Sequence, residues 1–485
     1  MILIAVVAIP LVLTFLCAVV RRSRSAGIIN AVGHGLVLAV CGYLAGHCAV
    51  SVEPVKLGNV LYVDSLSAFF LALISFVTTA AALYSIDYVA HEEEQGGHTA
   101  FKARWYYVLF NLFAASMFAV PMVNNLGLVW VAVEMTTLVS AFLVGFHNDK
   151  TSIEAAWKYI IICSVGIALA LLGIILLYHT VSAQGHVRTL NWTDMMAVRH
   201  LLDHNSVKIA FLFLLVGFGT KAGLVPMHSW LPDAHSQAPA PVSALLSAVL
   251  LKTALYALIR CTAVVHGTLG NHYTQNLFMA FGVVSLGVAA GLILVQKDVK
   301  RLLAYSSVEH IGIIFLGLGF GGLGVLGALL HIVNHAVTKS LMFFCAGSVV
   351  QRYKTNNMNI IHGVLSLMPL TGSITILGAF ALAGSPPFSI FISELVIVLG
   401  GFQQGHFAMT IAALIFMAVA FAGLITHFSG IVFGKKPEQE RRVPEGLCTR
   451  VSYGVLFVAM CVFGFWIPAA MYTVISSAAG IIQGM

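Results

Sequence analysis

Apolar runs long enough to cross a bilayer recur along the whole of this 485-residue chain. A helix needs about 20 apolar residues to span the hydrocarbon core of a membrane. Hydrophobic residues make up 59% of the chain and charged residues only 9%. Because no long polar stretch remains for a separate soluble domain, the sequence predicts an all-α, polytopic membrane protein.

The hydrophobic pattern predicts about 14 transmembrane helices. Their expected ranges are 1–20, 27–47, 61–89, 105–122, 124–146, 155–180, 206–222, 239–264, 274–295, 303–320, 324–350, 370–400, 407–433 and 453–480. The range 370–400 contains Pro386 and Pro387, so we expect a broken helix there.

The basic residues of the loops lie mostly on one side of the predicted helices. Those that follow odd-numbered helices are Arg21, Arg22, Arg24, Lys102, Arg104, Lys150, Lys297, Lys300, Arg301, Arg352, Lys354, Lys435, Lys436, Arg441, Arg442 and Arg450. The opposite loops hold only Lys56, Arg188, Arg199 and Lys208. Since basic loops stay in the cytoplasm, we predict a protein of the inner (cytoplasmic) membrane with both termini outside. The net charge of +7 therefore reflects topology and does not indicate a nucleic-acid partner.

Ionisable side chains interrupt the predicted helices. A charge at the centre of a bilayer costs roughly 3 kcal/mol to insert, so such residues usually serve a function. The basic ones are Lys158, Lys221, Lys252, Arg260 and Lys339, the acidic ones are Glu134, Glu309 and Glu394, and the histidines are His331, His335 and His427 within helices and His228 at the break after Lys221. Burial disfavours the charged forms of lysine and glutamate alike, which lets such groups exchange protons near neutral pH. The set therefore predicts a proton pathway.

The spacing of these residues suggests an internal repeat. Glu134 and Glu309 are 175 positions apart, Lys221 and Glu394 are 173 apart, and Lys252 and His427 are 175 apart. Lys221 and Glu394 each lie beside a helix break, at GLVP and at GSPP. A repeat of five helices enters the membrane from the opposite side in its second copy, as in inverted-repeat transporters. We expect helices 1–3 over residues 1–104, the two repeats over 105–264 and 265–433, and a cytoplasmic loop with helix 14 over 434–485.

Several of these residues also have a structural interpretation. Lys158 follows Glu154 at i+4, a spacing that favours an ion pair. Lys221 lies near a helix end and could snorkel to the surface. Glu394 could cap the second half of its broken helix, and His228 could simply hydrogen-bond the loop that carries it. Arg260 is expected to be an interfacial anchor.

Metal and cofactor signals are weak. His331 and His335 share one helix face and could bind a metal, but neither a carboxylate nor a cysteine completes the site in the sequence. The eight cysteines form no CxxC pair, and no Walker motif occurs. We therefore expect no cofactor in this subunit.

Four segments resemble the antiporter-like proton-pumping subunits of respiratory complex I and of membrane-bound hydrogenases. They are GTKAGLVPMHSWLPDAHSQAPAPVSALLSAVLLKTALYALIR, KDVKRLLAYSSVEHIG, HIVNHAVTKSLMFFCAGSV and ALAGSPPFSIFISE. The similarity runs over nearly the whole chain. Two further segments, WVAVEMTTLVSAFLVGF and SIEAAWKYIIICSVGIAL, are most similar to component F of hydrogenase-4 and formate hydrogenlyase-type complexes.

The resemblance implies a role for each matched position. Glu134 and Lys221 match an ion pair that opens and closes, and Lys252 matches a central lysine. His331, His335 and Lys339 match a polar row on one helix. Glu394 matches the terminal residue of the pathway, which is lysine in some members.

The resemblance also implies partners. These are other membrane subunits, a nickel–iron hydrogenase arm with iron–sulfur proteins, and membrane lipid. Some relatives continue into a long lateral helix, which this chain is not expected to supply. The alternatives are a subunit of a complex I, of a multisubunit Na⁺/H⁺ antiporter or of an inorganic-carbon-uptake system, or a structural membrane anchor.

Overall fold

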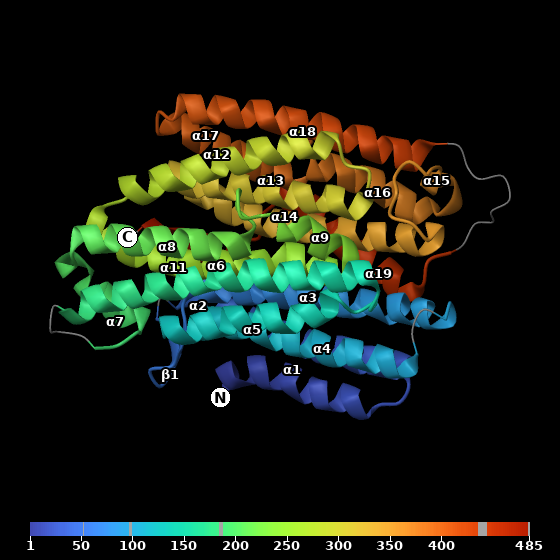
Figure 1. Cartoon of the computed structure of the whole chain (residues 1–485), viewed down its shortest axis with the longest axis horizontal. Coiled ribbons are helices and arrows are strands. Elements are labelled where there is room, and N and C mark those ends of the chain that lie inside the picture. Colours follow the sequence, from blue (N-terminus) through green and yellow to red (C-terminus); the bar gives the residue numbers. More distant parts are fainter. Residues whose placement is uncertain (52, 97–98, 184–187, 435–443, 484–485) are drawn as a thin grey trace.

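The computed structural model describes residues 1–51, 53–96, 99–183, 188–434 and 444–483, and it is a bundle of long helices that run along one direction (Figure 1). Within these residues, thirteen segments are long and apolar enough to cross a membrane. The helices are α1 (Ile2–Val19), α2 (Ser23–Val50), α3 (Ser65–Glu94), α4 (Ala100–Ala119), α5 (Leu126–Val144), α6 (Lys150–Ala183), α8 (His204–Ala222), α9 (Trp230–Gln237), α10 (Ala240–Leu245), α11 (Leu251–Leu269), α12 (His272–Leu294), α13 (Val299–Phe320), α14 (Leu323–Tyr353), α16 (Pro369–Leu382), α17 (Ser389–Gln403), α18 (Phe407–Phe433), α19 (Leu447–Phe465) and α20 (Ala469–Gln483).

The remaining elements are short and lie near the ends of the bundle. Strands β1 (Val55–Leu57) and β2 (Leu61–Val63) pair antiparallel, with Lys56 opposite Tyr62. They lie at the same end as α7 (Trp192–Val198), while α15 (Val364–Leu367) lies at the opposite end (Figure 1). The marks for the two chain ends both lie toward the end that carries β1 and α7 (Figure 1). The predicted basic residues Lys435, Lys436, Arg441 and Arg442 lie outside the described residues.

Two helices break inside the bundle, as the sequence predicts. Helix α8 ends at Gly223, whose φ is +85°, and α9 resumes the path at Trp230. Helix α16 ends near Gly384, whose φ is +73°, and α17 begins at Ser389. Glycine takes this left-handed conformation without steric cost, and the prolines in each break cannot continue a helix.

The element order also contains two sets of five helices. The first set is α4, α5, α6, the broken pair α8/α9, and the α10–α11 segment; the second is α12, α13, α14, the broken pair α16/α17, and α18. Glu134 and Glu309 lie on the second helix of each set, and Lys221 and Glu394 lie on the fourth. The exact residue boundaries of the repeats stay a prediction.

One predicted helix is wrong. The sequence predicts a single helix 14 over 453–480, but α19 ends at Phe465 and α20 starts at Ala469. Trp466 is extended, and Pro468 precedes α20. Proline lacks the N–H that a continuous helix needs and clashes with the preceding turn, which accounts for the break.

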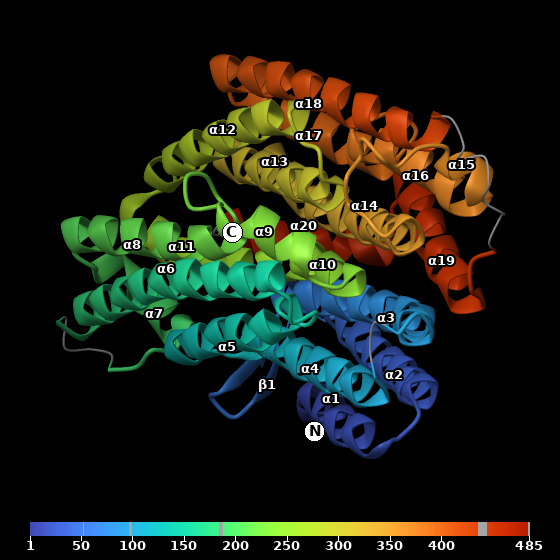
Figure 2. The ribbon, with the colours of Figure 1, turned by 45° about the vertical axis from the view of Figure 1, so that its right-hand side comes forward.

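The most buried segments lie in the middle of the bundle. The apolar windows of the α10–α11 segment and of α14 are 100% buried, and that of α13 is 94% buried. The corresponding windows of α1 and α18 are only 28% buried, and these helices lie on opposite flanks (Figure 2). Helices α11, α13 and α14 therefore carry the side chains that are shielded from lipid.

Candidate functional site

Helix α14 carries three predicted pathway residues on one face. His331, His335 and Lys339 follow one another at intervals of four residues, a spacing that aligns side chains along a helix. All three are completely buried. Since buried polar groups need partners, each must be matched by groups on the neighbouring helices.

Lys252 joins this face from α11. Its Nζ atom lies 2.7 Å from Nδ1 of His335 and donates to the Ser247 carbonyl at 2.6 Å. Ser247 belongs to a π-helical turn, Leu246–Leu250, that separates α10 from α11. Such turns interrupt the regular backbone bonding and are frequent at functional sites. Here the turn presents a carbonyl to the lysine.

His310 of α13 extends the row toward the second helix break. Its Nδ1 atom lies 3.0 Å from Nε2 of His331, and its ring centroid lies 4.7 Å from that of His335. The other nitrogen of His331 lies 3.0 Å from the Ser393 hydroxyl on α17. Imidazole can donate at one nitrogen while it accepts at the other, so this arrangement can pass a proton between helices.

Glu394 ends the row on α17. It is 7% exposed, and its carboxylate occupies the space that a Cβ atom on Gly384 would need. One ligating atom each from Glu394, His310 and His331 lie within 4.8 Å of one another. These three residues could thus hold a metal ion, although a hydrogen bond already joins Nδ1 of His310 to Nε2 of His331. The sequence predicts no carboxylate beside His331, whereas the structure supplies Glu394 from another helix.

Lys339 and Glu309 form a branch beside the row. Lys339 Nζ donates to the Leu303 carbonyl at 2.6 Å and to the Ser306 hydroxyl. Glu309 is 4% exposed, and its buried Oε2 atom has no hydrogen-bond partner among the described residues.

Glu134 and Lys221 form a second cluster between α5, α6 and α8. Lys221 Nζ donates to the hydroxyls of Thr137 and Tyr159, each at 2.7 Å. The Thr137 hydroxyl in turn donates to Glu134 at 3.3 Å, and Ser164 donates to the same carboxylate at 2.7 Å. A threonine thus bridges the expected ion pair. Lys221 is completely buried and does not snorkel to the surface.

Lys158 is not part of the row. Its side chain is 49% exposed, and it pairs with Glu154 at 2.7 Å and with Asp233 at 3.4 Å. This is the i, i+4 ion pair of the alternative interpretation. The apolar neighbours of Lys158 on α6 make the position look buried in the sequence, but those neighbours face lipid.

Two histidines lie apart from the row as well. His228 lies in the break after α8, half-buried, with its ring centroid 6.3 Å from that of Tyr305. His427 contacts the carbonyls of Ile293 and Leu294 at the end of α12, at 3.2 and 3.3 Å. His427 lies at the position that corresponds to Lys252 in the repeat. Its hydrogen bonds are with α12, whereas those of Lys252 are with the row.

Arg260 is not an interfacial anchor but a buried ion-pair partner. It is 1% exposed, and its guanidinium donates to both oxygens of Asp64, one of them at 2.8 Å. It also donates to Tyr256 and Ser67, and Trp192 covers it at 4.3 Å. Burial opposes the charged form of Asp64, but the guanidinium and the hydrogen bonds hold the pKa of this carboxyl below its usual value.

Sequence reasoning missed His310 as a member of the row. The sequence does point to this residue, because His310 follows Glu309 inside a predicted apolar helix. No nearby turn accounts for a polar side chain at that position. Thr137, Tyr159 and Ser393 carry no such signal, because hydroxyl residues are common in membrane helices. Only the tertiary structure selects them.

Two family models match the chain. Residues 123–421 match "NADH:quinone oxidoreductase/Mrp antiporter, TM", and residues 50–97 match "NADH-Ubiquinone oxidoreductase (complex I), chain 5 N-terminus". The first match alone covers more than half of the chain and includes every residue of the row.

Curated relatives and solved structures agree with this match. The hydrogenase-4 component F homolog of Methylacidiphilum infernorum (isolate V4) is 37% identical over 78% of this chain and 80% of its own length. Hydrogenase-4 component B of Escherichia coli (strain K12) is 35% identical over 69% of this chain and 50% of its own length.

A chain of respiratory complex I from Thermus thermophilus is 20% identical, with a TM-score of 0.84 over 100% of this chain and 99% of that one. A chain of an archaeal membrane-bound sulfane sulfur reductase is 24% identical, with a TM-score of 0.87 over 99% and 98% of the two chains. These likenesses establish the fold. The chain is a multi-pass, antiporter-like membrane protein and belongs to the NADH:quinone oxidoreductase/Mrp antiporter transmembrane family.

Proposed function

We propose that this chain translocates protons as a membrane subunit of a complex-I-like respiratory complex of the hydrogenase-4 type. The observation that carries the proposal is the buried row from Lys252 through His335, His310 and His331 to Glu394. Each member can bind and release a proton, and the contacts between them join neighbouring helices. Burying several ionisable side chains within a membrane is energetically costly. A transport function accounts for their presence.

The cluster of Glu134 and Lys221 controls the row in this proposal. In an interior of low dielectric, moving one charge by a few ångströms changes the energy of a neighbouring charge by several kcal/mol. The Thr137 hydroxyl connects the two residues, so its rotation joins or separates them. When Glu134 withdraws, the protonated form of Lys221 loses its stabilising partner. Binding of the proton to the row then becomes more favourable than binding to Lys221.

The partners follow from the relatives. Two curated relatives are components of hydrogenase-4, so we propose that this chain assembles with further membrane subunits and with a nickel–iron hydrogenase arm that contains iron–sulfur proteins. That arm would supply the redox energy, and no cofactor is expected in this chain. We place the complex in the inner membrane, with both termini of this chain outside.

The proposal is tested on the native complex, isolated through a tag on this chain and reconstituted in vesicles. Lys252→Met should abolish acidification of the lumen by redox turnover while the subunits remain assembled, because methionine fills the site but carries no proton. Lys208→Met, on the exposed face of α8, is the matched control and should leave pumping unchanged. Normal pumping in Lys252→Met would refute the proposed route.

Sodium/proton exchange is the second candidate. One component of a Na⁺/H⁺ antiporter from Alkalihalophilus pseudofirmus is 30% identical over 91% of this chain and 57% of its own length. Sodium would be bound by the carboxylates of Glu134, Glu309 and Glu394, which are oxygen ligands. Under this alternative, transport requires sodium and the purified complex contains no redox protein. Pumping in sodium-free buffer would exclude it.

A further inference from the structure

Two imidazoles and a carboxylate meet at the end of the row that lies beside the second helix break. They come from three helices, with His310 on α13, His331 on α14 and Glu394 on α17. Both histidines are completely buried, and Glu394 is 7% exposed. One ligating atom of each residue lies within 4.8 Å of the other two. The ligand atoms of a tetrahedral zinc site lie about 3.3 Å apart, so small movements would close these three around an ion.

The surroundings of His331 hold its ring as a metal ligand is held. The Ser393 hydroxyl donates to the Ile390 carbonyl at 2.9 Å, so it accepts from Nδ1 of His331 at 3.0 Å. The amide of Asn334 also donates to this hydroxyl, at 3.2 Å. Nε2 of His331 therefore keeps its lone pair, and it faces Nδ1 of His310 at 3.0 Å. Histidines that bind metals typically donate their second N–H to such a partner, which fixes the ring.

The hydrogen bond between the two rings occupies the place of the ion. With Nε2 of His331 as the acceptor, the shared proton belongs to Nδ1 of His310. Neutral imidazole carries its proton on either nitrogen, so His310 can move this proton to Nε2. The two nitrogens that face each other are then both free to bind a cation.

The donor set is suited to zinc. Two imidazoles and one carboxylate, with a fourth position open, are a common set of Zn²⁺ ligands. Mg²⁺ and Ca²⁺ prefer oxygen ligands throughout, and this site offers only one carboxylate. Glu394 is also the one anionic member of the set, so it supplies the charge that a divalent cation needs in a buried position.

The pair of histidines that the sequence suggests for a metal, His331 and His335, is not this site. Their ring centroids lie 6.4 Å apart, and Nδ1 of His335 lies 2.7 Å from Nζ of Lys252. A lysine at that distance competes with a metal cation for the imidazole. His310 and Glu394, from two other helices, take the place of His335.

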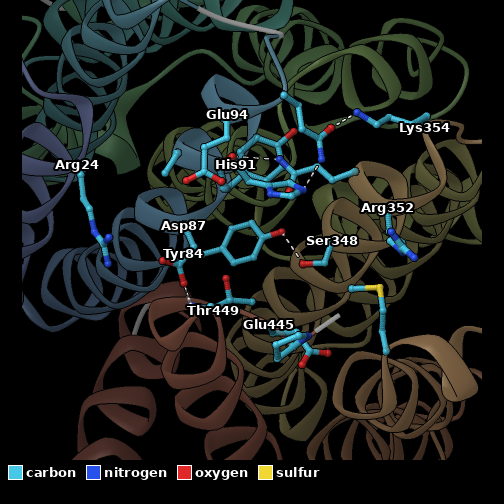
Figure 3. A pocket seen from close by; sticks show the side chains of 17 residues that line it. Arg24, Tyr84, Asp87, His91, Glu94, Ser348, Arg352, Lys354, Glu445 and Thr449 are labelled. Carbon is cyan, nitrogen blue, oxygen red and sulfur yellow. Dashed lines mark hydrogen bonds between the residues drawn. The ribbon is translucent and has the colours of Figure 1, made fainter. Parts of the chain in front are cut away.

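Carboxylate side chains also line a cavity of about 370 Å³ between the ends of α3, α14 and α19 (Figure 3). There Asp87 accepts from the backbone N–H of Thr449, and Glu445 accepts from Thr371. These bonds hold the first turns of α19 and α16. Within the part of the chain that the structure describes, only the two histidines and the glutamate of the row bring three such ligand atoms this close together.

We propose that His310, His331 and Glu394 bind Zn²⁺ and that the bound ion blocks the row. It occupies the proton-binding atoms of three consecutive members. Its charge also disfavours a proton on Lys252, because charges interact strongly in an interior of low dielectric. The ion is thus an inhibitor and not a cofactor of turnover. Its binding rests on the geometry of the three side chains, whereas the block rests on the proposed function.

Binding is tested on the purified complex, treated with a chelator and then dialysed against radioactive Zn²⁺. Wild type should bind one more ion per copy of this chain than Glu394→Gln, which keeps the shape of the side chain but removes the anionic ligand. His331→Asn should lose the same ion. His427→Asn, which changes a histidine outside the row, is the control and should retain it. Equal amounts of zinc in wild type and in both ligand variants would overturn the inference.

X-ray absorption at the zinc edge identifies the ligands. The ion that distinguishes wild type from Glu394→Gln should have nitrogen and oxygen ligands at about 2.0–2.2 Å. Sulfur ligands at about 2.3 Å would place this ion on cysteines and would also overturn the inference.

His335→Asn separates this inference from the proposed function. His335 belongs to the row but is not a ligand of the ion, so the variant should lose proton translocation and still bind zinc. In vesicles of the wild-type complex, saturating Zn²⁺ should slow acidification at least about tenfold, and a chelator should restore it. Full acidification with zinc bound would refute the block. If the wild type fails to acidify vesicles without zinc, the proposed function fails, and the binding result still stands.

Discussion

At the residue scale, the row depends on groups that exchange protons, and His310 is the member that lies beside both His331 and His335. His310→Asn keeps a polar side chain but replaces the imidazole with an amide, which does not bind and release a proton near neutral pH. Since positioned proton transfer contributes about 10²–10⁴-fold to a rate, we expect translocation to fall by at least about tenfold. Vesicle acidification at matched redox turnover measures it. His427→Asn is the control, and equal losses in both variants would contradict a specific role for His310.

The ion pair of Asp64 and Arg260 is expected to stabilise the fold rather than carry protons. Removing one partner leaves a buried charge unpaired, which costs about 3–5 kcal/mol, so Arg260→Met should lower the thermal midpoint of the detergent-solubilised complex. Asp203→Asn changes an exposed helix cap and should have little effect. An unchanged midpoint in Arg260→Met would refute this assignment.

The pH dependence of this pair follows from the lowered pKa of Asp64. A group whose pKa is depressed by folding stabilises the folded state above its unfolded pKa, and the stabilisation is lost as the pH falls through the folded value. The contribution of Asp64 should therefore persist at neutral pH and disappear only below about pH 4. Thermal midpoints of wild type and Asp64→Asn should differ at pH 7 and converge in acid.

At the scale of elements, close helix contacts position the row. Gly282 of α12 and Gly312 of α13 face each other so closely that a Cβ on either would lie 2.9 or 2.8 Å from the carbonyl oxygen of the other. Small residues allow such approach in membranes. Gly312 follows His310 by two positions, so this contact also fixes the helix that carries the central histidine.

Gly312→Leu should separate α12 from α13. Inserting a large side chain into a packed contact costs about 1–3 kcal/mol, so we expect a lower thermal midpoint together with reduced translocation. Gly291→Leu on α12 is the control, because no described atom would lie within 4 Å of a Cβ at that position. If both variants behave like wild type, the glycine contact does not hold the row.

At the scale of the whole molecule, both termini should lie outside. In a chain without Cys448 and Cys461, Lys56→Cys in β1 should react with an impermeant maleimide in right-side-out vesicles. Asn357→Cys, near α15, should react only in inside-out vesicles. The opposite pattern would reverse the predicted topology.

Much of the architecture can be predicted without the structure. Apolar length identifies thirteen of the spans because backbone groups in hydrocarbon must bond within their own helix. The two breaks follow from glycine and proline. The split of helix 14 is missed, since Pro468 is a single residue in an apolar run. The buried charges Lys221, Lys252 and Glu394 stand out because charge is costly in a membrane.

The sequence by itself determined the class, the broken helices and most of the ionisable residues, since these depend on local composition and on the cost of placing polar groups in lipid. Tertiary structure decided which of those residues meet. It moved Lys158 to the surface, paired Arg260 with Asp64, and placed His310 beside both His331 and His335. Such contacts join helices far apart in the chain, and hydropathy along one helix does not specify which faces pack together.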